Sequence, residues 1–368
     1  MRLLQCQRDV LLKPLSAVIG IVERRNTLPI LSNVLLQCEN EQLQCLATDL
    51  ELEVSARTEL SEEGAQLAVT TSARKLYDIV RSLPEDAQVT LDLQDTKLTV
   101  KAGRSRFTLQ TLDAATFPRM PAPEQGSVDI ELPQNVLREL LRVTQFAMAQ
   151  QDIRYYLNGL LIDLANGQLR LVATDGHRLA YCESGLAAPA GESNIILPRK
   201  AVQELSRLLS DTDDLVHLRL GPQQVRIRFG EVELATKVID GKFPDYNRVI
   251  PTAQPKRFDI DRMIFLNALR RAEILSNDRF PSVRLLLEPG CLRVSCTNNE
   301  QEEAAEEIEI EYVGEALDIG FNVSYLLEAL STLNSSSVTL HLSDANSSCL
   351  LTDSDHPGYR YVVMPMRL

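Results

Sequence analysis

The chain has 368 residues and a formal net charge of −13, with 51 acidic and 38 basic side chains. Apolar residues make up 44% of the sequence and charged residues 24%, which excludes collagen-like, coiled-coil and largely disordered proteins. No apolar run approaches the roughly 20 residues that a membrane helix needs. Arg8, Asp9 and Lys13 interrupt any signal-peptide core. We therefore expect a cytoplasmic protein of two or three domains.

The first predicted element is a helix, and similar helices recur later in the chain. Leu11, Leu15 and Val18 have the three- and four-residue spacing of one helix face. Related patterns return at intervals of about 126 residues. The three segments are QRDVLLKPLSAV from Gln7, PQNVLRELLRVT from Pro133 and IDRMIFLNALRR from Ile260.

Three further landmarks recur in the same order. Ala-Thr-Asp at 47–49 returns at 173–175 and, weakened to Cys-Thr-Asn, at 296–298. A second helical pattern occupies 73–83, 198–209 and 322–333, and Phe117-Pro118 recurs as Phe243-Pro244. Four landmarks with one period of about 125 residues predict three copies of one domain. The expected domains are 1–126, 127–254 and 255–368, joined by Pro-rich polar linkers at 121–127 and 251–256.

Short alternating stretches lie between the helices of each copy. Residues 89–93, 225–229 and 338–342 alternate apolar and polar side chains, which is typical of half-buried strands. Turn pairs such as Asn166-Gly167 and Pro289-Gly290 favour antiparallel hairpins. Each domain is thus expected to hold two helices among about eight short strands. The predicted class is α+β, with the helices on one face of antiparallel sheets.

The charge is divided unevenly between helices and the rest of the chain. The predicted helices 7–25, 70–83, 133–149, 198–209, 260–276 and 322–333 carry net charges of +2, +2, +1, +2, +1 and −1. Together they hold +7 of a total of −13, so the remainder carries −20. If the helices share one face, that face attracts a phosphate backbone while the acidic exterior repels it. The alternative is that basic residues only decorate exposed helix surfaces.

Motifs for chemistry are absent. There is no GxxxxGK[ST] phosphate loop, no GxGxxG and no GxSxG elbow. The seven cysteines form no CxxC pair and the four histidines no HExxH motif, so we expect reduced thiols, no metal and no cofactor. Asp175 and His177 could serve acid–base work, yet Thr48-Asp49 occupies the equivalent position without a histidine. The Thr-Asp pair is therefore interpreted as a structural turn, and no catalytic residue is expected.

Two segments remain outside this scheme. The acidic run at 300–311 is interpreted as a solvated strand face or an electrostatic partner for a basic patch. The terminal YRYVVMPMRL is apolar, and its last five residues are not explained as the end of a sheet. Met-rich, Pro-containing surfaces suit adaptable peptide binding.

Several motifs resemble the bacterial DNA polymerase III beta subunit family, the sliding clamps. They are RYYLNG at 154–159, ATDGHRLA at 173–180, FPDY at 243–246, GFNVSY at 320–325 and YVVMPMRL at 361–368. The resemblance spans the whole chain. It implies three clamp domains per protomer, a head-to-tail homodimer closing into a ring, and twelve helices lining the hole. It also implies a non-catalytic processivity factor that encircles duplex DNA.

The resemblance also implies partners and site residues. The partners are the DNA polymerase III catalytic subunit, the clamp loader, and other polymerases and repair proteins with short clamp-binding peptides; a membrane is not among them. The implied peptide cleft comprises Leu157, Thr174, Gly176, His177, Arg178, Leu179, Pro244, Arg248, Val249, Asn322, Tyr325, Ser348, Val362, Val363, Met364, Pro365, Met366, Arg367 and Leu368. Asn346 stands where the family often has an aliphatic residue, so we expect a more polar wall there.

Two more surfaces follow from the resemblance. Implied DNA contacts are Arg25, Gln151, Tyr155 and Tyr156, with Arg74, Lys75, Arg199 and Lys200 as further basic candidates. Implied dimer contacts are Arg104, Arg106, Phe107 and Leu109 against Ile274, Leu275, Glu302 and Glu303. Two rival interpretations are a nucleic-acid hydrolase that uses Asp175 and His177, and a scaffold that does not bind DNA.

Overall fold

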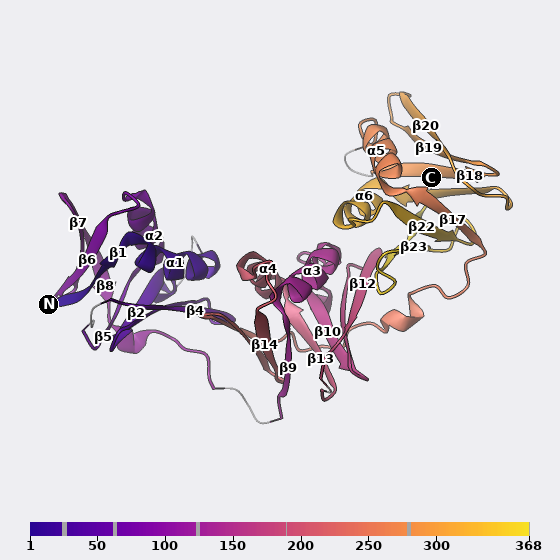
Figure 1. Cartoon of the computed structure of the whole chain (residues 1–368). Helices are drawn as coiled ribbons and strands as arrows, with labels where there is room; N and C mark the ends of the chain where they lie inside the picture. Colours follow the sequence, from indigo (N-terminus) through magenta and orange to yellow (C-terminus); the bar gives the residue numbers. More distant parts are fainter. Residues whose placement is uncertain (24–27, 62–64, 123–125, 189, 278–280, 368) are drawn as a thin grey trace. The chain divides into compact units, whose positions relative to one another are not determined.

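The structure is a computed structural model that describes residues 1–23, 28–61, 65–122, 126–188, 190–277 and 281–367 (Figure 1). In these residues the order of strands and helices is βαββββαβββ, and it occurs three times with one extra strand at the end. The threefold repeat predicted from the sequence is therefore present in the element order.

The first pass runs through β1 (Arg2–Gln7), α1 (Arg8–Val18), β2 (Asn33–Glu39), β3 (Gln42–Thr48), β4 (Leu52–Glu59), β5 (Leu67–Ser72), α2 (Ala73–Ser82), β6 (Gln88–Gln94), β7 (Lys97–Ala102) and β8 (Ser105–Leu112). The second comprises β9 (Val128–Pro133), α3 (Gln134–Thr144), β10 (Gly159–Ala165), β11 (Gln168–Thr174), β12 (Arg178–Gly185), β13 (Ser193–Pro198), α4 (Arg199–Leu208), β14 (Leu215–Leu220), β15 (Gln224–Phe229) and β16 (Val232–Lys237). The third comprises β17 (Lys256–Asp261), α5 (Arg262–Glu273), β18 (Ser282–Glu288), β19 (Cys291–Thr297), β20 (Glu303–Glu309), β21 (Leu317–Asn322), α6 (Val323–Thr332), β22 (Ser337–Leu342), β23 (Cys349–Asp353), β24 (Arg360–Val363) and β25 (Pro365–Met366).

The chain divides into two compact units, which are described separately. Unit 1 contains residues 1–136 and 203–238, and unit 2 contains residues 137–202 and 239–368. One sheet in unit 1 has the order β1-β6-β7-β8-β5-β2-β3-β4-β16-β15-β14-β9. Unit 2 holds the sheets β13-β10-β11-β12-β24-β23-β22-β17 and β20-β19-β18-β21-β25. All the pairings are antiparallel, as the hairpin turns predict.

The strand pairings repeat as the element order does. In each pass the first strand pairs with the strand after the second helix, as β1 does with β6, β9 with β14 and β17 with β22. Two further pairings join successive passes. β4 pairs with β16 in unit 1, and β12 pairs with β24 in unit 2. The passes are therefore connected edge to edge by equivalent strands.

The helices cover these sheets with their apolar faces. α1 contacts α2, β3 and β4, and it buries Leu11, Leu15 and Val18 as the helical spacing predicts. α5 and α6 lie side by side against the third-pass strands (Figure 1). Both have the capping that the local sequence allows: Asp261 accepts from the amide of Ile264, and Asn322 from the amide of Ser324.

The C-terminal segment is more ordered than the sequence suggested. Pro365 and Met366 form the edge strand β25, which pairs with Phe321 and Gly320 of β21. The amide of Met364 donates to the carbonyl of His177 at 2.9 Å. The expectation that the last five residues lie outside any sheet is therefore wrong for Pro365 and Met366. Leu368 lies outside the described residues.

Two observations concern membranes and cysteines. Among the described helices, none is both long and apolar enough to cross a membrane.

All seven cysteines are unpaired, and six of them are buried. Burial raises the pKa of the Cys6 thiol to about 12 and that of Cys38 to about 11, which keeps these thiols protonated and unreactive.

Candidate functional site

The Thr-Asp motif shapes a turn between strands. The Asp175 carboxylate accepts hydrogen bonds from the amides of His177 and Arg178 at 2.9 and 3.1 Å, and the Thr174 hydroxyl donates to the carbonyl of Arg178 at 2.6 Å. In the first pass, Asp49 accepts from the amides of Glu51 and Leu52 in the same way. The same bonds without a histidine show that this motif is structural, as the repeat predicted.

The second-pass turn borders a cavity of about 430 Å³ in unit 2. Its lining residues come from the turn, from the segment before β10, from the segment after Ile239, and from the β23–β24 hairpin. They are Arg154, Tyr156, Leu157, Thr174, Gly176, His177, Arg178, Leu179, Phe243, Pro244, Tyr246, Arg248, Val249, Ser348, Val362 and Met364.

The floor of the cavity is part of the hydrophobic core. Leu179, Phe243, Tyr246 and Val362 belong to one buried cluster that extends below the cavity. The Tyr246 hydroxyl donates to Asp163 at 2.5 Å, and burial together with this bond raises the pKa of Tyr246 to about 12. The Tyr246 ring packs in the buried cluster and its neutral hydroxyl is hydrogen-bonded, so this side chain forms a rigid apolar part of the floor.

The rim is polar, and most of its charged groups are already paired with other groups of the protein. Arg178 bonds Asp175, Glu328 and the carbonyl of Phe146, and its guanidinium lies 4.5 Å from the ring centre of Tyr325. This arginine is thus a fixed part of the wall. The side chain of Arg248 is 86% exposed, although it contacts Asp245 at 3.0 Å. Arg248 and His177 therefore supply the accessible polar groups at the mouth.

A glycine is required at one point of this rim. Gly176 has φ +90°, and a Cβ there would lie 2.9 Å from Nη1 of Arg154. Arg154 is itself held by Asp152, with bonds of 2.8 and 3.0 Å, and by the carbonyl of Asp175. These Arg154 hydrogen bonds lower the pKa of Asp152 to about 2. The Arg154 guanidinium thus lies in the space that a side chain at position 176 would occupy.

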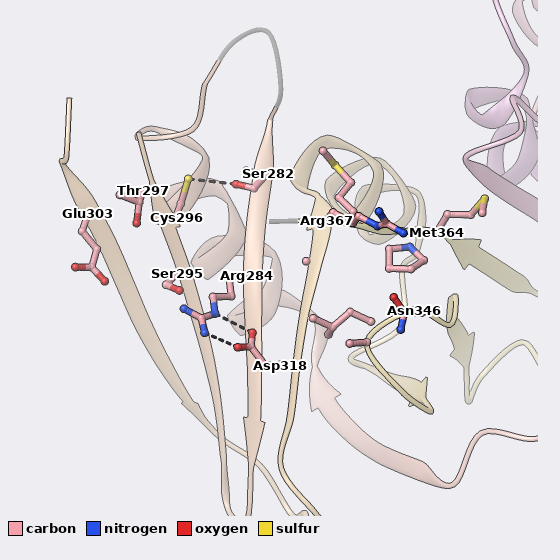
Figure 2. A pocket seen from close by; sticks show the side chains of 15 residues that line it. Ser282, Arg284, Ser295, Cys296, Thr297, Glu303, Asp318, Asn346, Met364 and Arg367 are labelled. Atoms are coloured by element: carbon pink, nitrogen blue, oxygen red, sulfur yellow. Dashed lines mark hydrogen bonds and ion pairs between the residues drawn. The ribbon is translucent and has the colours of Figure 1, made fainter. Parts of the chain in front are cut away.

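Twelve predicted cleft residues line this cavity together: Leu157, Thr174, Gly176, His177, Arg178, Leu179, Pro244, Arg248, Val249, Ser348, Val362 and Met364. Asn322, Tyr325 and Val363 do not line it; Asn322 caps α6 and Tyr325 packs on Arg178. Pro365, Met366 and Arg367 instead line a second concavity of about 1050 Å³, together with Asn346 (Figure 2). Met364 borders both spaces. Leu368 lies outside the described residues.

The second concavity follows the exposed face of the third-pass sheet. Figure 2 shows Arg284 of β18 paired with Asp318 of β21, and Met364 and Arg367 on the opposite side near Asn346. Its lining is mostly hydroxyl, amide and charged groups. The expected polar effect of Asn346 therefore falls on this space and not on the apolar cavity.

Four cavity residues were missed by the sequence analysis: Arg154, Tyr156, Phe243 and Tyr246. Phe243 carried a usable signal, since Phe117 and Phe243 recur at the repeat period and both are buried. Tyr156 was assigned to DNA, whereas its ring packs against the core cluster. Arg154 carried no signal, because its place depends on Gly176 and Asp152.

The remaining predicted DNA residues have different surroundings. Tyr155 is 58% exposed, and Gln151 and Lys75 are also exposed. Arg74 donates to the carbonyl of Val22 at 2.7 Å, and Arg199 to the carbonyl of Met148 at 2.9 Å. Both guanidinium groups therefore bind main-chain carbonyls, and they also add positive charge to their helices. Lys200 is half-buried, and Arg25 lies outside the described residues.

Comparison with known proteins identifies the family. Residues 2–121, 131–245 and 247–367 match the N-terminal, central and C-terminal domains of the DNA polymerase III beta subunit. The Pseudomonas putida beta sliding clamp is 48% identical over 365 residues, which cover 98% of this chain and 99% of that protein. The chain belongs to the DNA polymerase III beta subunit family.

Solved clamp structures agree with this chain along its whole length. A Pseudomonas aeruginosa DNA polymerase sliding clamp with ligand has a TM-score of 0.96 at 47% identity, covering 100% of both chains. A sliding clamp of the same species bound to griselimycin also has a TM-score of 0.96 at 47% identity, covering 99% of both chains. The predicted fold is therefore confirmed as three α+β clamp domains with helices on antiparallel sheets.

The predicted dimer residues of this clamp lie on β8 and β20 or near these strands. Arg104 and Arg106 are exposed at the β7–β8 hairpin, Phe107 is half-buried and Leu109 is 8% exposed. In the third pass Ile274 is 77% exposed at the end of α5, and Leu275 is half-buried. Glu302 and Glu303 are exposed at the start of β20.

Proposed function

We propose that this protein is a DNA sliding clamp that closes into a ring as a head-to-tail dimer and tethers DNA polymerase III and other clamp-binding proteins. The observation that carries the ring is a strand pairing that is incomplete within one chain. β4 pairs with β16, and β12 pairs with β24. By the repeat, the third such pair is β20 with β8.

Neither of these two strands has its expected partner. Among the described strands β20 pairs only with β19, and β8 meets β5 only at Thr111 and Leu112. A second copy placed head to tail supplies β8 to β20, and the first copy does the same in return. A heterologous contact that closes after two subunits gives a finite ring, and it removes both open sheet edges.

The side chains near these edges suit such a contact. Phe107 supplies apolar area on one side, with Leu109 buried two residues further along β8, and Ile274 and Leu275 supply it on the other. Arg104 and Arg106 bring positive charge opposite Glu302 and Glu303, which gives the acidic run a partner. Opposite charges at the rim favour this orientation over other pairings.

Retention on DNA then follows from topology. A closed ring leaves duplex DNA only by opening, so tight binding to DNA is unnecessary. The six described helices carry a net charge of +7, and phosphate contacts from basic side chains are mobile and independent of base sequence. We assign these contacts to Arg25, Arg74, Lys75, Gln151, Tyr155, Tyr156, Arg199 and Lys200. No bond is made or broken by the protein.

The cavity beside the Thr-Asp turn of the second pass is the site for partner peptides. A pocket with a rigid apolar floor and a few polar groups at its rim suits a short peptide with aliphatic or aromatic anchors and one hydrogen-bonding side chain. Occupation of this pocket by the polymerase or the clamp loader places each partner on the ring. Tethering raises the effective concentration of the polymerase at the primer end.

The domain limits 1–126, 127–254 and 255–368 belong to the same proposal, supported by the three family matches and by the repeated strand order. We place the protein in the cytoplasm, at the nucleoid during replication. Primer extension tests the function: a replicative polymerase with clamp loader should make long products on a singly primed circle only when this protein is present. Equal product length without the protein would contradict the proposal.

A further inference from the structure

The strand pairing that borders the cavity occurs a second time in the chain. In unit 2, Val362 lies opposite Leu179 on one side and Leu350 on the other. In unit 1, Ala235 lies opposite Glu53 and Arg226 in the same register. Glu53 and Leu179 are 126 residues apart, as the repeat requires. A buried apolar row next to the cavity is thus replaced in unit 1 by a row with a carboxylate and a guanidinium.

The backbone around the two rows is the same. The amide of Met364 donates to the carbonyl of His177, and the amide of Lys237 donates to the carbonyl of Glu51, both at 2.9 Å. The buried clusters below them also correspond. Leu35, Leu46 and Phe117 form one cluster, and the residues 126 positions later, Leu161, Val172 and Phe243, belong to the other. Unit 1 therefore holds a structural counterpart of the peptide cavity.

The chain's own linker lies over this counterpart. The amide of Met120 donates to the Glu53 carboxylate at 2.9 Å, and Arg226 donates to the carbonyl of Pro121 at 2.5 Å. Gln224 donates to the carbonyl of Ala122 at 2.8 Å. Glu53 is only 6% exposed. Three side chains of the sheet thus bind three successive backbone groups of the linker, as a receptor binds an extended peptide.

The equivalent segment in unit 2 takes another path. Residues Tyr246–Arg248 form a short 3₁₀ turn, in which the amide of Arg248 bonds the carbonyl of Asp245. Met120 stands where Tyr246 stands, but Pro121 follows it. A residue before proline is disfavoured in the helical region, so the linker of unit 1 stays extended. One linker turns away and leaves a cavity, whereas the other remains on the sheet.

We infer that the chain contains a second, latent peptide-binding site, and that linker residues Arg119–Ala122 occupy it as an intramolecular ligand held by Glu53, Gln224 and Arg226. In the parent protein the ligand of this site is an extended segment recognised through its backbone. With the apolar row of unit 2 in place of Glu53 and Arg226, the site would instead take the apolar anchors of a peptide, as the cavity of unit 2 does. This arrangement leaves each protomer with one open site for partners. The polar row of unit 1 holds the linker over that site, and the apolar row of unit 2 leaves its cavity free for a partner peptide.

Hydrogen exchange tests the attachment of the linker without any peptide ligand. Glu53→Leu with Arg226→Leu copies the apolar row of unit 2 into unit 1. The Met120 amide should then exchange at least about tenfold faster, because it loses a buried charge-assisted hydrogen bond. The control Glu59→Leu removes an exposed carboxylate from the same strand β4, and it should leave this amide unchanged. Glu53→Leu alone also removes the acceptor of this hydrogen bond, and it provides a second variant if the double variant does not fold. Unchanged exchange in these Glu53 variants would overturn the attachment.

Peptide stoichiometry tests the latent site, and this part rests on the proposed function. The probe is a synthetic peptide of one glutamine followed by aliphatic and aromatic residues, titrated by calorimetry. We expect one peptide per protomer for the parent and two for the Glu53→Leu/Arg226→Leu variant. One peptide per protomer in a variant whose Met120 amide exchanges freely would overturn the latent site. No binding by the parent would count against the proposed function, while the exchange experiment still decides the attachment.

Discussion

Gly176→Ala perturbs the peptide cavity through a single methyl group. The residue has φ +90°, a region in which an L-residue is strained by roughly 1–2 kcal/mol. The new Cβ would also lie 2.9 Å and 3.0 Å from the two terminal nitrogens of Arg154. Real side chains do not accept the shorter distance, so the guanidinium must move and lose its bond to the carbonyl of Asp175.

The expected loss of stability is about 2 kcal/mol, mostly from the backbone strain, because the half-exposed Arg154 bonds contribute little. Arg154 forms part of the cavity wall, so we also expect peptide affinity to fall by about tenfold, or 1.4 kcal/mol. Urea unfolding followed by tyrosine fluorescence measures the first quantity, since the chain has no tryptophan. Fluorescence anisotropy of a labelled clamp-binding peptide measures the second.

Leu50 offers a matched control. It occupies the equivalent turn position at φ +80° and already carries a side chain. Leu50→Ala adds no atom to the turn and no new strain, so both stability and peptide affinity should stay close to those of the parent. The reasoning about this turn would be refuted if Gly176→Ala behaved like Leu50→Ala in both assays.

Three other predictions use different parts of the molecule. Ile274→Ala with Leu275→Ala removes apolar area from the proposed contact, so sedimentation should show a folded monomer; an undisturbed dimer would reject this interface. Tyr155→Ala should make the loaded ring slide faster along DNA, equally on all sequences and without shortening its residence on a circle, as measured by single-molecule tracking; a sequence-dependent change would argue against phosphate contact. Burial raises the pKa of Glu53 above 4.5, so its stabilising contribution is full below the unfolded pKa and is lost as pH rises through the folded pKa. The melting temperature of Glu53→Gln should therefore gain on the parent as pH rises from 4 to 7; a constant difference would contradict this.

The fold was predictable because the same local patterns occur three times. Helix spacing such as that of Leu11, Leu15 and Val18, and alternation such as that of residues 89–93, depend on neighbours in the sequence. Each copy alone gives a weak signal, and the agreement of three copies makes the assignment of helices and strands firmer. The Thr-Asp turn was predictable for the same reason, since Asp49 and Asp175 could be compared directly.

What the sequence did not reveal depends on contacts between distant segments. Arg74 and Arg199 look like free cations, yet each holds a carbonyl of a segment about 50 residues away. The strand formed by Pro365 and Met366 needs the edge of β21 before it has a partner. Glu53 reads as an ordinary polar strand residue, and its burial follows from the linker that covers it.

Most of the cavity came from the resemblance and not from the residues alone. No spacing rule brings Leu157, His177 and Val362 together. Their meeting depends on β12 pairing with β24, a contact between strands about 180 residues apart. Members of the family share the fold, so residues in matching motifs occupy equivalent positions. The resemblance could therefore place these residues in one cleft.

The central claim is that the protein holds DNA by encircling it. The most direct measurement loads the protein onto a nicked circular DNA with the clamp loader, removes free protein, and then cuts the circle once. The account predicts that the protein stays on the circle through gel filtration and is released within the time of free diffusion to the new ends. Equal retention on circular and linear DNA would contradict it, because that result would require binding by contact rather than by topology.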